Sequence, residues 1–497
     1  MTSGTSYSRV WPKARRAALA AVLLATPLAA PAPALAQARQ GPKTVAPVAE
    51  KLLDAVVNIS TSQTLKSSRG VPLPKVPKGS PFEDLFEDFF SGRNGQQPSD
   101  KKVASLGSGF VIDGKAGLIV TNHHVIEGAD EITINFADGS KLKVDKVIGK
   151  DTKTDLALLK VTPRKPLKQA AFGSSANMKV GDWVMAIGNP FGLGGSVTVG
   201  IISAKQRDIN SGPYDDYLQT DAAINKGNSG GPLFNMDGEV IGVNTAIISP
   251  SGGSIGIGFA VPSDTAMLII EQLRQFGETR RGWLGVNVQS VTDDIAESLG
   301  TAENAGALIS NVTPDGPAAK AGIKPGDVVV RFDGKPVPNM RALPRLVTQT
   351  PVGRTVDVEV IRNRQSSIIK VVIGRLEEKD AKDDGKKPAE TPAKPGKASQ
   401  DQIPGLRISP ITDELRAKYK IGARTSGIVI VEIDAASRAG KKGLKVGEVI
   451  VEAAQETVTS LEDLAKSIAK VRNGGRRQLL LRLEDGRGNM RFVAVPI

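Results

Sequence analysis

The chain has 497 residues, of which 40% are hydrophobic and 24% charged, and its formal net charge is +13. A chain of this length predicts about three domains, and the composition excludes a mainly disordered or collagen-like protein. The sequence has no cysteine and only two histidines, His123 and His124. Disulfide scaffolds, thiolate metal sites, cysteine nucleophiles and two-histidine zinc motifs are therefore excluded, and no P-loop sequence is present. We expect no metal and no cofactor.

The N-terminus has the features of an export signal. Four basic residues between Arg9 and Arg16 precede an apolar stretch over residues 17–30, and Ala34-Leu-Ala36 follows. Because the apolar stretch is interrupted by a proline and is shorter than the ~20 residues that span a bilayer, we predict a cleaved signal peptide over residues 1–36. Its loss lowers the net charge from +13 to +9. We expect a periplasmic protein that makes at most peripheral contact with a membrane, and the absence of cysteine suits that oxidising compartment.

The basic residues are spread along the chain and mixed with acidic ones. The densest basic stretch, residues 379–397, contains Asp and Glu among its lysines. A nucleic-acid site would concentrate basic residues and place aromatic residues among them. We therefore expect no nucleic-acid partner.

Residues 45–270 predict a mainly β domain. Short runs of Val, Ile and Leu, such as residues 109–112, 118–121 and 156–161, are separated by Gly, Asn and Asp. Many short strands with regular turns are typical of a β-barrel or β-sandwich.

One short amphipathic helix is predicted within this region, after the helix start at Ser80-Pro81. Its apolar positions recur with helical spacing and are mostly aromatic: Phe82, Leu85, Phe86, Phe89 and Phe90. Two hypotheses remain for this aromatic face. It packs on its own domain, or it docks on a neighbouring subunit or in a substrate groove.

The C-terminal half contains an internal repeat. A shift of 121 residues aligns 306–337 with 427–458 without a gap, and ten of the 32 positions are identical. Each copy predicts a strand, a helix of small residues, a glycine turn and a second strand, on the scale of a small domain. Residues 377–402 between the copies are mostly Lys, Asp, Glu, Pro, Ala and Gly, which predicts a flexible linker.

With no cysteine and no metal site, nucleophilic catalysis requires a serine or a threonine with a base nearby. Ser229 lies in Asn225-Lys-Gly-Asn-Ser-Gly-Gly-Pro232, where the glycines leave the hydroxyl clear and allow N–H groups to form an oxyanion hole. The two histidines end a predicted strand, and Asp155 precedes another apolar run. The order His, Asp, Ser is one of the known arrangements of a catalytic triad. Periodicity leaves open which histidine takes part, because successive side chains of an extended segment point opposite ways.

Three segments together resemble the HtrA/DegP family of exported, ATP-independent serine endoproteases. They are Thr121-Asn-His-His-Val125, Thr154-Asp-Leu-Ala-Leu158 and Gln219-Thr-Asp-Ala-Ala-Ile-Asn-Lys-Gly-Asn-Ser-Gly-Gly-Pro-Leu233. The resemblance implies a mainly β fold, with a chymotrypsin-like double β-barrel protease domain followed by two PDZ domains. The implied boundaries are 37–279 for the protease domain, with a regulatory loop at 64–104, then 280–376 and 403–497 for the PDZ domains.

The resemblance also implies roles for the protease residues. His124 would be the general base, Asp155 would orient it, and Ser229 would attack the peptide carbonyl. Gly227, Asn228 and Ser229 would form the oxyanion hole, with the N–H groups of Gly227 and Ser229 as donors.

Ile224 and Ile247 match positions that line the primary specificity pocket in this family. Two branched aliphatic walls leave room for Val, Ala or Ile and offer no counter-charge to Lys or Arg. We therefore predict cleavage after small aliphatic residues.

The segment Arg281-Gly-Trp-Leu-Gly-Val286 resembles the carboxylate-binding loop of a PDZ domain. Trp283, Leu284, Gly285 and Val286 would bind the C-termini of substrates, with the following strand pairing with the peptide. The second copy offers only Gly405-Leu-Arg-Ile408, which favours an interaction or assembly module.

The remaining implications concern regulation and assembly. Arg207 matches a residue that senses PDZ ligands, and Phe86, Phe89 and Phe90 lie in a loop that regulates access and links subunits. We expect homo-oligomers built from trimers that degrade unfolded or misfolded exported proteins. The alternative is a chaperone or scaffold that holds misfolded chains and cleaves them incidentally.

Overall fold

The computed structural model describes residues 41–65, 101–189, 195–212, 214–225, 227–249, 253–301, 305–377 and 402–497. The predicted signal peptide, the helix with Phe86, Phe89 and Phe90, and residues 378–401 of the predicted linker lie outside the described residues. The chain divides into Met1–Thr44 and Val45–Ile497, and all elements below belong to the second unit. No helix in the described residues is long and apolar enough to span a bilayer.

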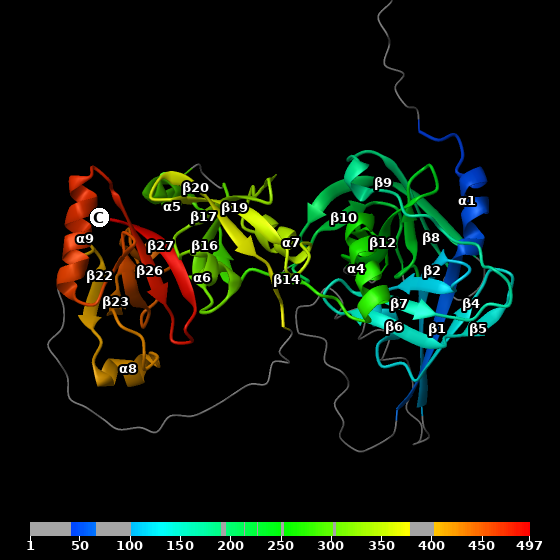
Figure 1. Ribbon diagram of the computed structural model, residues 1–497, viewed down its shortest axis with the longest axis horizontal. Coiled ribbons are helices and arrows are strands. Elements are labelled where there is room, and N and C mark those ends of the chain that lie inside the picture. Colours follow the sequence, from blue (N-terminus) through cyan, green and yellow to red (C-terminus); the bar gives the residue numbers. More distant parts are fainter. Residues whose placement is uncertain are drawn as a thin grey trace, which may run out of the picture. The chain divides into compact units, whose positions relative to one another are not determined.

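Seven strands form the first sheet, and every neighbouring pair in it is antiparallel (Figure 1). In sheet order they are β5 (Lys141–Lys143), β4 (Glu131–Asn135), β1 (Val56–Leu65), β2 (Lys101–Asp113), β3 (Leu118–Thr121), β7 (Leu156–Lys160) and β6 (Lys146–Asp151). The edge strands β5 and β6 are joined only by Val144 and Asp145. Because such a connection spans at most about 11 Å, the sheet must curve until its edges approach each other, as in a barrel.

Six further antiparallel strands close into a second barrel. In order around it they are β10 (Tyr217–Thr220), β13 (Gly258–Pro262), β12 (Val240–Ile247), β11 (Pro232–Phe234), β8 (Trp183–Gly188) and β9 (Ser196–Arg207). The mainly β fold with a double barrel, predicted from the sequence, is confirmed.

Strands β3 and β7 are buried on both faces and serve two hydrophobic cores. Ile119 and Leu159 fill the first barrel. Val120 and Leu158 belong to a core that also contains Met185 of the second barrel. Because successive side chains of a strand point to opposite faces, these strands are apolar throughout rather than alternating.

Helix α4 (Ser263–Phe276) packs against β6, β7 and β12, and so covers both barrels. It ends at Gly277, whose φ of +73° provides the left-handed C-cap that a glycine adopts without strain. Shorter helical segments of this domain are α1 (Ala46–Leu52), η1 (Leu53–Ala55), α3 (His123–Ile126) and η2 (Ser175–Asn177).

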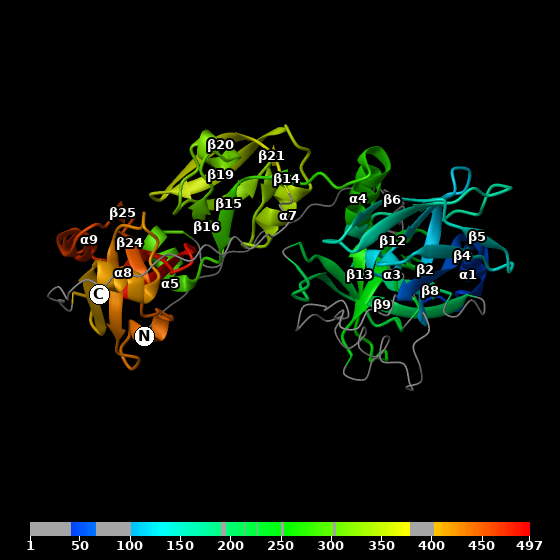
Figure 2. The same ribbon diagram turned by 90° about the horizontal axis from the view of Figure 1, so that it is seen from below.

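The first repeat is a five-stranded antiparallel sheet with a short extra strand and three helices (Figure 2). Its strands are β15 (Val286–Gln289), β16 (Ala307–Val312), β17 (Val328–Phe332), β19 (Thr355–Arg362) and β20 (Gln365–Val372), with β18 (Lys335–Pro336) on β17. Its helices are α5 (Asp293–Leu299), α6 (Pro317–Ala321) and α7 (Ala342–Thr348). A separate pair, β14 (Gly282–Trp283) and β21 (Gly374–Arg375), joins its two ends.

The second repeat has the same sheet order. Its strands are β22 (Leu406–Pro410), β23 (Ile428–Ile433), β24 (Val449–Ala453), β26 (Gln478–Glu484) and β27 (Met490–Pro496), with β25 (Glu456–Thr457) on β24. Its helical segments are α8 (Asp413–Tyr419), η4 (Gly440–Lys442) and α9 (Leu461–Asn473). The strand, helical turn, glycine and strand expected in each copy are present, although the second copy forms a 3-10 turn instead of an α-helix.

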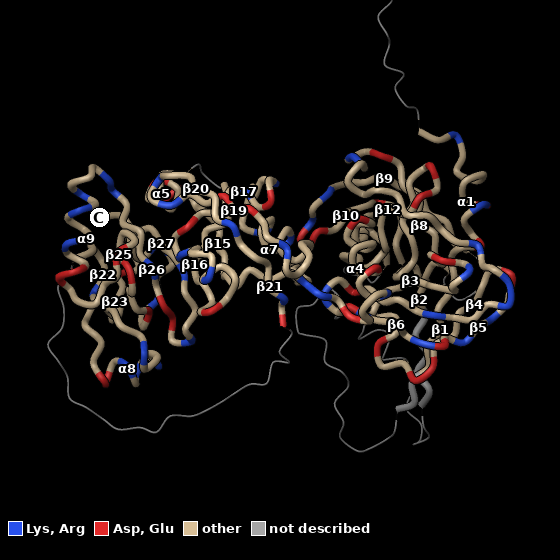
Figure 3. The backbone as a smooth tube through the Cα atoms, viewed as in Figure 1, with Lys and Arg blue, Asp and Glu red and all other residues tan. Residues whose placement is uncertain are grey.

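Lys and Arg are interspersed with Asp and Glu over the described parts of both barrels and both repeats (Figure 3). Many of these charges form exposed pairs, such as Lys370 with Asp357 at 2.8 Å. Such pairs contribute little to stability, because water screens them and ordering the side chains costs entropy.

Candidate active site

His124 and Asp155 form a close pair on the first barrel. The Nδ1 atom of His124 lies 2.5 Å from Oδ2 of Asp155, and the backbone N–H of His124 donates to Oδ1 at 2.8 Å. His123 meets Asp155 through its backbone, whose N–H donates to the Asp155 carbonyl at 3.1 Å. The side-chain contact therefore selects His124, the histidine that the family resemblance implied.

The local structure around the histidines differs from the sequence expectation. The segment was expected to be extended, but β3 passes directly into α3, a single helical turn that contains both residues. Adjacent side chains in a helix diverge by about 100°. His124 can then face Asp155 while the His123 side chain is buried to 5% exposure.

Asp155 is held in an uncommon backbone conformation, with a φ of +55°. Its carbonyl accepts a hydrogen bond from Nδ2 of Asn122 at 2.8 Å, in addition to the one from His123. Left-handed conformations of residues other than glycine persist only where the surroundings fix them, and they are common at functional sites. Four contacts from Asn122, His123 and His124 thus fix both the carbonyl and the carboxylate of this aspartate.

The loop that carries Ser229 lies between β10 and β11 and packs on the end of β3. The carbonyl of Ser229 accepts from the N–H of Ser108 in β2 at 2.9 Å. Gly230 has a φ of +83°, and a Cβ atom there would lie 2.4 Å from Oγ1 of Thr121. Only a glycine fits at this approach. The loop of Ser229 therefore meets the first barrel three residues before His124, so the three predicted triad segments come together.

The loop that carries the predicted oxyanion residues is fixed by a buried hydroxyl. Oγ of Ser108 donates to the carbonyl of Gly227 at 2.5 Å, and Gly227 has a φ of +100°. The N–H of Asn228 donates to the carbonyl of Asn225 at 3.0 Å. Asn228 therefore uses its N–H inside the turn, which leaves Gly227 and Ser229 as the proposed oxyanion donors. The sequence analysis did not identify Ser108, because one serine in a β-strand carries no motif.

The electrostatic environments of the two histidines differ. Burial lowers the pKa of His124, but the charge of Asp155, its hydrogen bond and the charge of Glu127 outweigh burial, so the pKa is raised above 6.5. Burial lowers the pKa of His123, despite the opposing charges of Glu127 and Asp155. His124 is thus the stronger base, as a group that accepts a proton from a serine requires.

The predicted specificity residues share one apolar cluster in the second barrel. Ile224 is buried to 1% exposure, and Ile247 packs against the same cluster. A Cβ atom at Gly258 would lie 2.8 Å from Cγ1 of Ile224. Ile224 therefore packs directly on the backbone at Gly258, where a larger residue would displace it.

The predicted carboxylate-binding loop leads into an edge strand of the first repeat. Leu284 is buried in the core of the repeat, and its carbonyl accepts from the N–H of Ala318 at 2.9 Å. Gly285 has a φ of +79°, and Val286 begins β15, the edge strand. Trp283 packs its ring within 3.3 Å of where a Gly285 Cβ would lie. An edge strand after a fixed glycine turn is the arrangement that can accept an extended peptide.

Arg207 lies at the end of β9, and its Nε donates to Oε1 of Gln219 at 2.9 Å. The loop that follows it contacts the first repeat through two acidic residues instead. Asp208 pairs with Arg341, and Asp216 pairs with Arg345 at 2.7 Å.

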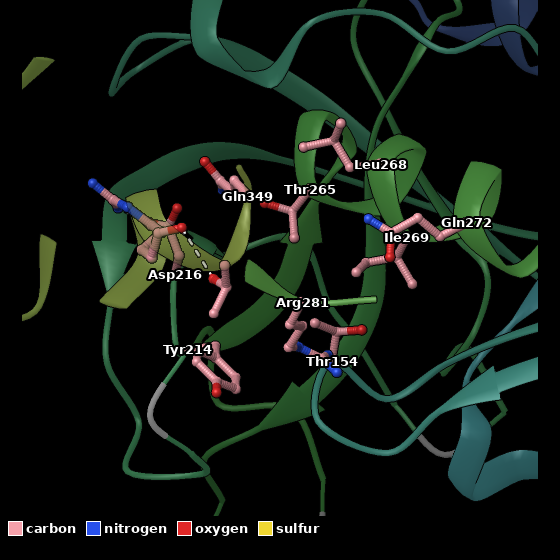
Figure 4. A pocket seen from close by; sticks show the side chains of 11 residues that line it. Thr154, Tyr214, Asp216, Thr265, Leu268, Ile269, Gln272, Arg281 and Gln349 are labelled. Carbon is pink, nitrogen blue, oxygen red and sulfur yellow. Dashed lines mark hydrogen bonds and ion pairs between the residues drawn. The ribbon is translucent and has the colours of Figure 1, made fainter. Parts of the chain in front are cut away.

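The same loop lines a small pocket (Figure 4), in which Tyr214 and Asp216 lie with Thr265 of α4 and Gln349. The contacts of Asp208 and Asp216 with the first repeat could not be predicted, because charged residues so far apart in sequence show no pattern.

Two family models match the chain. The model described as a trypsin-like peptidase domain matches residues 107–243, which contain His124, Asp155 and Ser229. The model described as a PDZ domain matches residues 282–373.

Relatives match over nearly the whole length. The probable periplasmic serine endoprotease DegP-like of Brucella suis biovar 1 (strain 1330) is 41% identical over 475 residues, which cover 91% of this chain and 89% of the relative. The protein of the same name in Rhizobium meliloti (strain 1021) is 40% identical, covering 97% of this chain and 98% of its own. Among solved structures, the HtrA-type protease AlgW with decapeptide is 38% identical, with a TM-score of 0.54, and covers 68% of this chain and 100% of its own.

The double barrel, the His124–Asp155 pair and these matches define a trypsin-like serine protease that carries a PDZ domain. Within that class the chain belongs to the DegP-like serine endoproteases, whose solved relatives are of the HtrA type. The family resemblance found in the sequence is confirmed.

Proposed function

We propose that this endoprotease acts through a triad of His124, Asp155 and Ser229. The observation that carries the proposal is the 2.5 Å contact between His124 and Asp155, beside the packed loop of Ser229. Oγ of Ser229 attacks the scissile carbonyl while His124 takes its proton, and Asp155 stabilises the resulting imidazolium. The N–H groups of Gly227 and Ser229 receive the oxyanion. His124 then returns the proton to the leaving amine, and water hydrolyses the acyl-enzyme.

The cleavage site is proposed to follow a small aliphatic residue. The cluster around Ile224 and Ile247 supports this preference, because it offers an apolar wall to the substrate side chain. Peptide mapping of a digested unfolded protein should show cuts mainly after Val, Ala or Ile. A digest dominated by cuts after Lys or Arg would contradict the assignment.

The substrates are proposed to be unfolded or misfolded exported proteins. A substrate must lie extended in the active site, and a folded domain costs several kcal/mol to open. The relatives are named periplasmic, which supports a periplasmic location for this chain. Digestion is expected to need no ATP, since the sequence has no P-loop.

The first repeat is proposed to bind substrate C-termini through residues 283–286 and β15. The second repeat, residues 403–497, is proposed to be a second PDZ domain that serves interaction or assembly. We further propose a homo-oligomer built from trimers. Its mass in solution, with and without an unfolded substrate, tests the assembly.

Arg207 is proposed to take part in sensing PDZ ligands, and its contact with Gln219, near the oxyanion loop in sequence, supports that role.

The experiment that tests the function compares Ser229→Ala with Ser203→Ala, a serine of β9 outside the proposed site. Ser229→Ala should reduce casein digestion on the order of 10⁶-fold, whereas Ser203→Ala should digest normally. Unchanged digestion by Ser229→Ala would remove this serine from the mechanism. Suppression of aggregation by the Ser229→Ala variant would show that a holding activity exists beside proteolysis.

A further inference from the structure

A buried carboxylate lies four residues before the catalytic aspartate and is not part of the triad. Asp151, the last residue of β6, is 2% exposed. Its Oδ2 atom accepts from Oγ1 of Thr154 at 2.5 Å and from Nη2 of Arg281 at 2.5 Å. Its Oδ1 atom accepts from the N–H of Lys153 at 3.3 Å and from Oγ1 of Thr279 at 3.4 Å. Asp151 therefore closes the turn that ends at Asp155.

This turn leads directly into the catalytic carboxylate. Thr154 directly precedes Asp155, whose φ of +55° is sparsely populated for residues other than glycine. The hydrogen bond from Thr154 to Asp151 fixes the peptide that leads into this conformation. The β3–α3 segment holds Asp155 from the other side, through its carbonyl and through the contacts of His124 with its carboxylate. Without the contacts of Asp151, only the β3–α3 segment would restrain Asp155.

The cation that neutralises Asp151 comes from the first repeat. The Arg281 side chain is 5% exposed, and its Nη1 also donates to Oγ1 of Thr279 at 2.9 Å. Its guanidinium carbon lies 5.3 Å from the ring centre of Tyr214. Figure 4 shows Arg281 beside Thr154. A buried carboxylate that loses its cation keeps the cost of desolvation without the compensating attraction.

Arg281 also has a notable position in the sequence. It lies outside the 107–243 peptidase match and directly precedes the Gly282–Trp283 strand that enters the predicted carboxylate-binding loop. An arginine at that position could instead serve as the cation for a peptide carboxylate. Its guanidinium is buried against Asp151, so the structure favours the contact with the protease domain.

We propose that Arg281 is a positioning residue for proteolysis, which acts through Asp151 and Thr154 to hold Asp155 against His124. The proposal rests on the triad proposed above. The active site would then depend on a residue of the PDZ side of the chain even when no C-terminus is bound.

The test uses a short peptide substrate with an amidated C-terminus, so that PDZ capture of a carboxylate plays no part. Arg281→Gln and Asp151→Asn should each lower kcat on the order of 10- to 100-fold with little change in KM, the size expected when catalytic groups are misplaced. The double variant should lose no more than the worse single variant, because both act on one contact.

A pH profile separates positioning from general destabilisation. His124 faces Asp155, with Glu127 as the other charge that raises its pKa against the effect of burial. When Asp155 moves away, the acidic limb of the profile of kcat/KM should shift to lower pH in both variants. Asp151 is not among the groups that act on the pKa of His124, so a shift reports a change in geometry.

Two controls keep the test decisive. Arg362→Gln breaks a comparable Arg–Asp pair inside the first repeat, with Nε 2.6 Å from Oδ1 of Asp327, and should leave kcat and the pH profile unchanged. If the variants at 281 and 151 unfold, Thr154→Val should reproduce the loss of kcat and Thr154→Ser should retain activity, because only serine keeps the hydroxyl.

The proposal is overturned if Arg281→Gln and Asp151→Asn behave like Arg362→Gln, or if Arg281→Gln impairs only the binding of free C-termini. It is also overturned if Thr154→Val is as active as Thr154→Ser. An inactive wild type, or an active Ser229→Ala variant, would instead contradict the proposed triad, so the two failures are distinguishable.

Discussion

The two repeats share one sheet order, but they differ at the turn that precedes the edge strand. In both, a glycine with positive φ occupies this turn, Gly285 at +79° and Gly405 at +84°. The glycine carbonyl accepts an N–H from the following hairpin in each case, from Thr313 at 2.8 Å and from Asp434 at 2.9 Å. The backbone of a carboxylate-binding turn is therefore present twice.

The surroundings of the two turns are different. In the first repeat Gly316 approaches Gly285, and Trp283 packs over both. In the second repeat Ser437 takes the place of Gly316, and its side chain would lie 2.2 Å from a Cβ atom at Gly405. The second turn is thus filled by a side chain. The backbone of the turn is therefore shared, whereas the space around it differs between the repeats.

A second comparison concerns an ion pair that each repeat builds at the residue before its third strand, β17 or β24. In the first, Arg362 binds Asp327 with Nε to Oδ1 at 2.6 Å. In the second, Arg491 binds Glu448 with Nε to Oε1 at 2.9 Å. Arg362 lies on β19, the first strand of its hairpin, but Arg491 lies on β27, the second strand of the equivalent hairpin. The same contact is reached from opposite strands.

Removal of this carboxylate is the largest change in stability that we predict, and it tests whether the repeats are equivalent. Asp327→Ala and Glu448→Ala should each destabilise their own repeat by about 3 kcal/mol, because a guanidinium and a backbone N–H lose their acceptor. Hydrogen exchange of the whole chain, read separately for the two repeats, measures the loss. Asp357→Ala removes an exposed carboxylate and should cost less than about 1 kcal/mol. If only one of the two variants lowered the protection of its own repeat, the equivalence would be contradicted.

Peptide binding should separate the repeats. Gly285→Ala places a side chain at positive φ in the first turn, which costs about 1–2 kcal/mol. A peptide with a free C-terminus should then bind on the order of 10-fold more weakly, as measured by fluorescence anisotropy. Gly405→Ala strains the second turn at least as much, because its Cβ would also meet the Ser437 side chain, and should leave this affinity unchanged. Equal losses in both variants would mean that Ser437 does not close the second turn to ligands.

Much of the fold and the site could be predicted from local sequence. The repeat, the β-rich region and the three catalytic segments are contiguous patterns, and glycines mark their turns. The choice between His123 and His124 could not be made from periodicity, because it depends on a single helical turn that tertiary contacts impose. Arg362 and Arg491 were not found because they are not related by the shift of 121 residues. Their common role appears only when both hairpins are folded.

The two helices that follow the short strands β18 and β25, α7 and α9, differ in how they begin. In the second repeat α9 has a capping box, in which Oγ of Ser460 accepts from the N–H of Asp463 and the Asp463 carboxylate accepts from Ser460 in return. In the first repeat α7 begins after Arg341 without such a box, and Oδ1 of Asn339 accepts from the N–H groups of Arg341 and Ala342 instead. Ser460→Ala should destabilise the second repeat by about 1 kcal/mol. Hydrogen exchange at the start of α9 measures this loss, and equal protection in variant and wild type would contradict it.

The smallest predicted effect is a difference in acid sensitivity between the two helices. Hydrogen bonds from Thr459 and then from Ser460 lower the pKa of Asp463 from 3.8 to about 2. Because the folded-state pKa is depressed, the stabilisation is complete above pH 3.8 and is lost as the pH falls through about 2. Hydrogen exchange at the start of α9 should therefore quicken over this interval relative to Asp463→Asn. The start of α7 has no acidic residue in its first turn and should show no such step. A step of equal size in both helices would assign the acid sensitivity to the repeats as a whole instead of to the cap.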